Sequence, residues 1–314
     1  MKTPWALAVH GGAGRLRKSE TRDPGRQSYD RAIARALAAG GAILRRGGSA
    51  VRAVTEAVVV LEDEPLFNAG RGAALCVDGS VELSAAVMSG RSHAVGAMVG
   101  LKRTRNPVRA ARAIMGHSHC LLFGSHGDEY AEERGLEQVP IDYFLVPHRR
   151  RQWERAKNRA LLHLDHSDEA HGTVGAVARD RKGNLAAATS TGGLVNQLPG
   201  RVGDSPVAGA GTWADARCAI SATGTGDAFF RVAFARRVAD LVDLTSVPLE
   251  EAARRALDDV RTVKGQGGCI LLGPAGAPTF AFNSPQMVRG VWAQQKPMVS
   301  ALSLDDAREV SETD

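Results

Sequence analysis

The segment His-Gly-Thr-Val-Gly-Ala-Val-Ala, residues 171–178, decides the fold of this 314-residue chain. A polar, charged stretch ends at Gly172, and Thr173 begins an apolar strand. Glycine tolerates strained backbone geometry and leaves its carbonyl open to attack by a neighbouring hydroxyl. A threonine with a free α-amine, whose unperturbed pKa is about 8, carries both a nucleophile and a base. The segment therefore suits a chain that cuts itself before Thr173, although a lone Gly-Thr-Val more often only begins a strand.

Two strands joined by a tight turn follow this point. Residues 173–178 and 184–190 are apolar runs, and the turn between them, 180–183, is typical of a hairpin. The other expected elements are strands at 3–9, 120–123, 269–272 and 279–282, short strands between 73 and 101, and helices ending at 47, starting after 49 and 106, and spanning 228–241 and 249–260. Residues 148–171 are polar and poorly periodic, which indicates an exposed linker. Hairpins grouped with paired helices predict a layered α+β fold.

Two loops downstream carry groups that suit an amino-acid substrate. Arg201 and Asp204 lie three residues apart in the loop 200–206. A guanidinium binds a carboxylate through two parallel hydrogen bonds, and a carboxylate binds an ammonium. The pair would therefore hold both charged groups of an α-amino acid, while a surface salt bridge is the plainer alternative.

The second loop, Ser221–Asp227, is rich in glycine and leads into a helix. Such turns offer backbone N–H groups to anions, including the oxyanion of acyl transfer. The loop lacks the third glycine of a dinucleotide fingerprint, and no βαβ unit precedes it. A dinucleotide site is therefore not expected.

Composition bounds the class of protein. The chain is 44% hydrophobic and 24% charged, which is typical of a globular domain. No window approaches the roughly 18 apolar residues of a membrane helix, and the apolar run 5–9 is too short for a secretory signal. The cysteines at 76, 120, 218 and 269 form no C-x-x-C pair, which fits reduced thiols. We expect a cytoplasmic protein with no membrane partner.

The net charge of +6 raises nucleic-acid binding as a rival idea. The one dense basic run is His148–Arg155, which has a single aromatic residue and matches no known binding module. We interpret it as a solvated surface segment and expect no nucleic-acid partner.

Together these segments resemble the plant-type asparaginase and isoaspartyl peptidase family of N-terminal-nucleophile hydrolases. The matching segments, in family order between residues 5 and 292, are His10–Gly14, Leu66–Gly70, His171–Gly175, Thr189–Gly193, Gly200–Pro206 and Thr223–Gly226, with a weaker likeness from Phe282 to Trp292. Several motifs in one order are far more specific than any single one. The resemblance implies an α+β fold, a four-layer αββα sandwich formed by one domain, 1–314. It also implies self-cleavage into an α chain, 1–172, and a β chain, 173–314, with two such heterodimers paired in a homodimer.

The resemblance assigns the catalytic residues. Thr173 is the nucleophile, released by cleavage after Gly172. Thr191 is the hydroxyl beside it that tunes its amine and side chain, and Asn68 faces it from the α chain.

The resemblance likewise assigns the groups that bind substrate. Arg201 holds the α-carboxylate, and Asp204 with the Gly226 carbonyl holds the α-ammonium. Thr223 and the Gly224 N–H form the oxyanion hole.

A loop within residues 61–71 is similar to a family loop whose main-chain carbonyls bind sodium. The residues it implies are Leu61, Glu62, Glu64, Phe67, Ala69 and Arg71. Because carbonyls bind the ion, the unusual Arg71 side chain need not abolish the site. No organic cofactor is expected beside this structural sodium ion.

Two segments depart from the family pattern. Serine stands at positions 84 and 89, where relatives usually carry aspartate, and the sequence assigns no role to Ser84. The residues His117, His119, Cys120 and His126 are of metal-binding types. Strand-like alternation would point the first two histidines one way and the cysteine the other, which argues against a metal site.

We therefore expect an enzyme that hydrolyses β-aspartyl (isoaspartyl) dipeptides and the side-chain amide of L-asparagine, releasing L-aspartate. Two alternatives stay open. A glycosylasparaginase-like amidase uses similar threonine chemistry, and a non-catalytic basic protein could keep the fold and bind nucleic acid. The sequence does not place the loops that would set the balance between asparagine and dipeptides.

Overall fold

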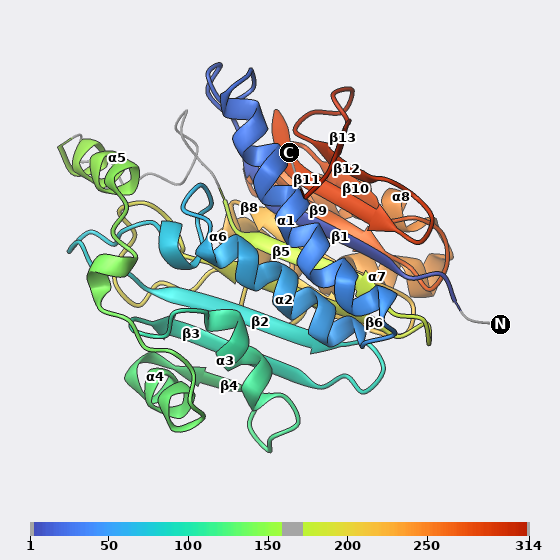
Figure 1. Cartoon of the computed structure of the whole chain (residues 1–314), viewed down its shortest axis with the longest axis horizontal. Coiled ribbons are helices and arrows are strands. Elements are labelled where there is room, and N and C mark those ends of the chain that lie inside the picture. The colour runs from blue at the N-terminus through green and yellow to red at the C-terminus, as the bar shows by residue number, and fades with distance from the viewer. Residues whose placement is uncertain (1–2, 159–171, 313–314) are drawn as a thin grey trace.

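A computed structural model of the chain describes residues 3–158 and 172–312. The elements form four layers, in which helices cover the outer faces of two stacked sheets (Figure 1). The expected αββα sandwich is confirmed.

The larger sheet has nine strands in the order β13-β12-β11-β1-β5-β6-β2-β3-β4. Its strands are β1 (Ala6–Gly14), β2 (Leu83–Ser89), β3 (Val95–Leu101), β4 (Leu121–Phe123), β5 (Val174–Arg179), β6 (Leu185–Thr191), β11 (Gln286–Ala293), β12 (Met298–Ala301) and β13 (Arg308–Val310). All neighbours are antiparallel except β3 and β4. The hairpin expected at 173–190 is the central pair β5–β6, with Val174 opposite Ser190.

The smaller sheet has four antiparallel strands in the order β10-β9-β8-β7. They are β7 (Thr212–Ala214), β8 (Ala219–Gly224), β9 (Gly267–Leu272) and β10 (Thr279–Phe282). The last two match the strand pair expected from the sequence.

Helices α1 (Gly25–Arg45) and α2 (Ala50–Asp63) lie on the outer face of the larger sheet (Figure 1). The Ser49 side chain caps α2 by accepting a bond from Arg52 N at 3.3 Å, as the sequence suggested. Helices α3 (Pro107–Ile114) and α4 (Gly124–Glu133) extend this layer, and α7 (Phe234–Thr245) and α8 (Leu249–Thr262) cover the smaller sheet. No helix among the residues described is long and apolar enough to cross a membrane.

Strand alternation builds the three cores between these layers. On β1, Leu7 and Val9 face the helices, while Ala6 and Ala8 face the smaller sheet. Between the sheets, alanines pack with larger side chains such as Met88, Ile270 and Leu272. A third core packs α7 and α8 onto the smaller sheet.

The expected exposed linker at 148–171 is wrong for its first part. Residues Pro147–Asn158 form helix α5. Arg149, Trp153 and Ala156 follow helical spacing and turn toward the protein: Arg149 is 2% exposed, and its Nε donates to the Gly72 carbonyl at 2.7 Å. Residues 159–171 lie outside the described part of the chain.

The expected helix 228–241 is also wrong as a single element. It divides into α6 (Gly226–Arg231) and α7, because Ala233 adopts a left-handed conformation with φ +47°. Phe230 is 46% exposed, whereas Phe234 and Val238 are buried. Near the N-terminus, the first strand was expected to end at residue 9. Strand β1 instead continues to Gly14, with an irregularity between His10 and Gly12.

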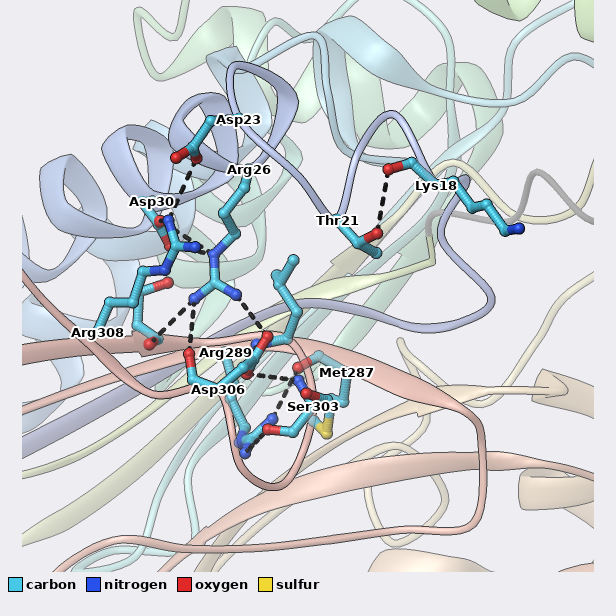
Figure 2. Close-up of polar contacts among 12 residues, drawn as sticks. Lys18, Thr21, Asp23, Arg26, Asp30, Met287, Arg289, Ser303, Asp306 and Arg308 are labelled. Atoms are coloured by element: carbon cyan, nitrogen blue, oxygen red, sulfur yellow. Dashed lines mark hydrogen bonds and ion pairs between the residues drawn. The ribbon is translucent and has the colours of Figure 1, made fainter.

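A buried ion cluster fastens the C-terminal strands to α1 (Figure 2). Arg26 is 1% exposed, and its Nε binds both carboxylate oxygens of Asp30 at 2.9 and 3.0 Å. Its other nitrogens reach the side chain and carbonyl of Asp306. Asp306 also accepts bonds from the main-chain N–H groups of Leu302 and Ser303. The cluster therefore joins the start of the chain to its last strands.

Candidate active site

Thr173 lies at the start of β5, in the centre of the larger sheet. Its side chain is largely buried, and its Oγ1 donates to the Thr191 hydroxyl at 3.0 Å. Thr191 ends the neighbouring strand β6, so the hairpin itself places the two hydroxyls together. Ser205 Oγ stands 3.4 Å from the Thr173 hydroxyl. The nucleophile expected from the sequence is thus held among hydroxyl groups on a rigid strand.

Asn68 contacts the turn that follows Thr191. Its side-chain amide donates to the Gly193 carbonyl at 2.7 Å and accepts from Ala74 N at 2.8 Å. The Gly193 N–H in turn donates to the Thr191 hydroxyl at 3.1 Å. Asn68 therefore borders the same cavity as Thr173 while bracing the turn beside Thr191.

Arg201 and Asp204 lie together, but Arg201 forms its salt bridge with another carboxylate. Its Nη2 is 2.7 Å from Asp227 Oδ2, at the start of α6. Asp204 is 3% exposed. The Arg201 Nε and the Asp204 Oδ2 are buried with no hydrogen-bond partner in the described part of the chain. Buried polar atoms without partners are costly, so this arrangement suits a ligand that completes them.

Gly226 forms the wall beside these two groups. A methyl group in place of its hydrogen would lie 2.8 Å from Asp204 Oδ1 and 2.9 Å from Arg201 Nη2. The absence of a side chain therefore keeps the space next to both charges open. Burial raises the pKa of Asp204 to about 7, against the lowering effect of Arg201.

Thr223 lies at the end of β8, facing the residue before the nucleophile. A methyl group at Gly172 would lie 2.8 Å from the Thr223 hydroxyl oxygen, and this oxygen has no partner among residues 3–158 and 172–312. Gly224 follows with φ +147° and packs tightly on the Gln266 carbonyl, where a side chain would not fit. A free hydroxyl next to a cleavable carbonyl suits an oxyanion hole.

A narrow cavity of about 10 Å³ lies among these groups. Its lining residues are Asn68, Gly172, Thr173, Thr191, Gly193, Leu194, Arg201, Gly203, Asp204, Ser205, Gly224 and Gly226. All the expected catalytic and substrate-binding residues except Thr223 therefore line one cavity, and Thr223 lies beside its lining residue Gly172.

The loop expected to bind sodium is a separate feature, and two of its carbonyls pack against glycines. A methyl group at Gly70 would lie 2.5 Å from the Glu62 carbonyl oxygen, and one at Gly72 would lie 2.0 Å from that of Phe67. A side chain at either glycine would therefore clash with one of these carbonyls. The Arg71 side chain is exposed and stacks on Tyr143, so it leaves the loop interior clear.

Of the two serines that depart from the family pattern, only Ser84 has a side-chain hydrogen bond within the part of the chain that the structure describes. Ser84 lies opposite Thr191 in the sheet and accepts a hydrogen bond from Gly100 N at 3.2 Å, where the register of β2 and β3 shifts. Nothing in the structure explains Ser89. The histidines at 117, 119 and 126 are exposed. Within the described ranges, no group of three or more His, Cys, Asp or Glu side chains is placed to hold a metal ion.

Sequence reasoning missed a buried polar network behind Thr173. His10 Nε2 lies 2.8 Å from Ser221 Oγ, and the Ser221 hydroxyl lies 2.8 Å from that of Thr189. The Thr212 hydroxyl is 2.6 Å from Thr189 Oγ1 and 2.9 Å from the Ser205 carbonyl. Burial lowers the pKa of His10 to about 3, against a smaller raising effect of the Thr173 main chain. A neutral imidazole thus ties the two sheets together, a long-range contact that local sequence patterns do not signal.

Sequence comparison places this geometry in a known class. Residues 3–300 match the family described as asparaginase, and the chain belongs to that family. It is 42% identical to an isoaspartyl peptidase of Salmonella typhimurium over 292 residues, which cover 90% of this chain and 93% of the relative. It is likewise 42% identical to an Escherichia coli isoaspartyl peptidase, with 90% and 91% covered. A mouse isoaspartyl peptidase/L-asparaginase is 40% identical, with 92% and 87% covered.

Proposed function

We propose that the protein is a threonine hydrolase that releases L-aspartate from β-aspartyl dipeptides and from L-asparagine. The observation that carries this proposal is one cavity that holds the Thr173 hydroxyl together with the incompletely bonded Arg201 and Asp204. These groups match the reacting carbonyl, the α-carboxylate and the α-ammonium of such a substrate. Aspartate release from β-aspartyl-leucine and from asparagine tests the proposal, and absence of release from both would refute it.

Maturation comes first in this mechanism. The Thr173 hydroxyl attacks the Gly172 carbonyl, the peptide C–N bond breaks as the nitrogen takes a proton, and water hydrolyses the resulting ester. The free Thr173 amine then serves as the base. The nearby Thr223 hydroxyl supports this step, since it faces Gly172.

Substrate hydrolysis follows the same pattern. The Thr173 amine takes the proton of the hydroxyl as the oxygen attacks the β-carbonyl of the substrate. The Thr223 hydroxyl and the Gly224 N–H stabilise the oxyanion. The leaving amine takes the proton, and water then attacks the ester and releases aspartate. Thr191, which accepts the Thr173 hydrogen bond, orients the nucleophile.

The two alternatives differ in what they would bind. A glycosylasparaginase-like amidase shares the threonine chemistry, so release of aspartate from glycosylated asparagine separates it. A non-catalytic protein that binds nucleic acid would not require a buried carboxylate such as Asp204, one oxygen of which lacks a hydrogen-bond partner among the described residues. The basic run of α5 does not favour it either, because Arg149 turns inward. Salt-dependent DNA binding would be its signature.

Three further proposals concern the state of the protein. The carbonyls of Leu61, Glu62, Glu64, Phe67, Ala69 and Arg71 hold a structural sodium ion that rigidifies the loop containing Asn68. The cleaved protein forms a homodimer of αβ heterodimers. Its free cysteines, of which three are buried, support a reducing, cytoplasmic location.

Replacing Arg201 with lysine should lower kcat/KM on β-aspartyl dipeptides while self-cleavage continues. Lysine keeps the charge but loses the planar fork, which weakens carboxylate binding by roughly 1–3 kcal/mol. The exposed Arg231→Lys in α6 is the matched control and should behave as the wild type. An unchanged kcat/KM for Arg201→Lys would place Arg201 outside the substrate site.

The pH dependence of ligand binding should report Asp204. The pKa of its carboxyl is raised to about 7, so the carboxylate that attracts an ammonium is present above this pH and is lost as the pH falls through it. The inhibition constant of L-aspartate should therefore rise by about tenfold for each pH unit below 7. Succinate, which lacks the ammonium, should show no such rise. Parallel curves for both ligands would contradict the assignment.

A further inference from the structure

Gln197 occupies a position that the catalytic assignments leave unused. It lies on the loop between β6 and β7, and its side chain is 6% exposed. Its main chain is fixed independently of the side chain: the N–H donates to the Leu194 carbonyl at 3.3 Å, and the carbonyl accepts from Val77 N at 2.9 Å. Two main-chain bonds of the loop therefore remain when the side chain is substituted.

The side-chain oxygen of Gln197 serves two parts of the site at once. It accepts a hydrogen bond from Leu194 N at 2.8 Å and one from Arg201 Nη1 at 3.4 Å. A methyl group at Gly193 would lie 2.3 Å from the same oxygen, so the turn closes directly over it. One buried acceptor thus joins the turn that borders the cavity to the guanidinium expected to bind the substrate.

The guanidinium of Arg201 is accordingly held from two sides. Its Nη2 meets Asp227 and its Nη1 meets Gln197, while its Nε has no partner among the residues described. Its side chain is only 16% exposed. Because a long arginine side chain otherwise has many rotamers, fixing two of its nitrogens reduces the entropy lost when a carboxylate binds the remaining edge.

We propose that Gln197 is a positioning residue that holds Arg201 ready for the α-carboxylate of the substrate. This inference rests on the proposed function, in which Arg201 binds that carboxylate. Gln197 touches no reacting atom in this scheme and acts only through Arg201 and the Gly193–Leu194 turn. Its contribution should therefore depend on whether the substrate has an α-carboxylate.

The test compares two substrates in two variants. Gln197→Met keeps the length of the side chain and removes the acceptor. On β-aspartyl-leucine, kcat/KM should fall about tenfold, mainly through KM, since one hydrogen bond to a charged group is lost. On the analogue whose aspartyl α-carboxylate is an α-carboxamide, the change should stay within about twofold, because the charged partner of Arg201 is already absent.

The matched control is Cys76→Ala. It removes the 3.6 Å contact between Cys76 Sγ and the Gln197 amide nitrogen but leaves the acceptor oxygen in place. Its kcat/KM on both substrates should match the wild type. Self-cleavage of Gln197→Met, seen on a denaturing gel, should also be complete.

The outcomes separate the possibilities. An equal loss on both substrates would mean that Gln197 only maintains the loop, and no loss on either would mean that Arg201 needs no such support; each overturns the inference. Either result leaves the proposed function intact as long as the wild type releases aspartate. A wild type that releases none would refute the function itself.

Discussion

Thr173→Ala should remain one uncut chain and lose hydrolysis of β-aspartyl dipeptides by at least about 10⁴-fold. Alanine has no hydroxyl to attack the Gly172 carbonyl, so no free amine forms at residue 173. The same missing hydroxyl is the nucleophile toward substrate, and both losses therefore have one cause. A denaturing gel with N-terminal sequencing follows cleavage, and aspartate release follows turnover.

Thr173→Ser is the matched control for this variant. Serine keeps the hydroxyl that reaches Thr191, so this chain should still cut itself and retain activity. A fully active enzyme that stays a single chain would end the N-terminal-nucleophile assignment, whatever the behaviour of the serine variant.

Acetylation of the substrate amine should lower kcat/KM about a thousandfold on β-aspartyl-leucine at pH 8. The acetylated amine carries no charge, so the buried Asp204 carboxylate would lose its partner inside a cavity that is largely closed to solvent. The enzyme would thus act only at the start of a peptide.

The acetyl group also adds bulk, and a second compound separates the two effects. Succinyl-leucine lacks the amine but is no larger than the substrate, and it should lose nearly as much. If Asp204 is only a turn residue, succinyl-leucine would react as well as the unmodified dipeptide. Comparable turnover of all three compounds would point to a different class of substrate.

The local parts of this structure could be predicted from sequence because the signals are short. Two apolar runs joined by a turn signal predicted the central hairpin, and Ser49 marked the start of α2. The predicted site residues each belong to a distinctive motif, and the fold places most of those motifs around one cavity.

The features that the sequence did not predict depend mostly on contacts between distant segments of the chain. Helix α5 was missed because its buried face includes Arg149, whose Nε donates to the distant Gly72 carbonyl. The break before α7 lies at Ala233, and alanine gives no warning of a left-handed conformation. The partner of Arg201 was likewise unforeseen, since Asp227 lies 26 residues further along the chain.

The strand order carries a consequence for what self-cleavage does to the molecule. A cut before Thr173 would leave β1 in one polypeptide, yet β1 lies between β11 and β5, which belong to the other. The strands of the two chains would thus alternate within one sheet. The ion pair between Arg26 and Asp306 would add a further contact between the two chains. Their first unfolding step would stay unimolecular, as in the uncut chain. Once separated, however, the two chains could refold only by a bimolecular encounter that inserts the central strand β1 into its sheet. Unfolding of the cleaved protein would therefore become irreversible in dilute solution.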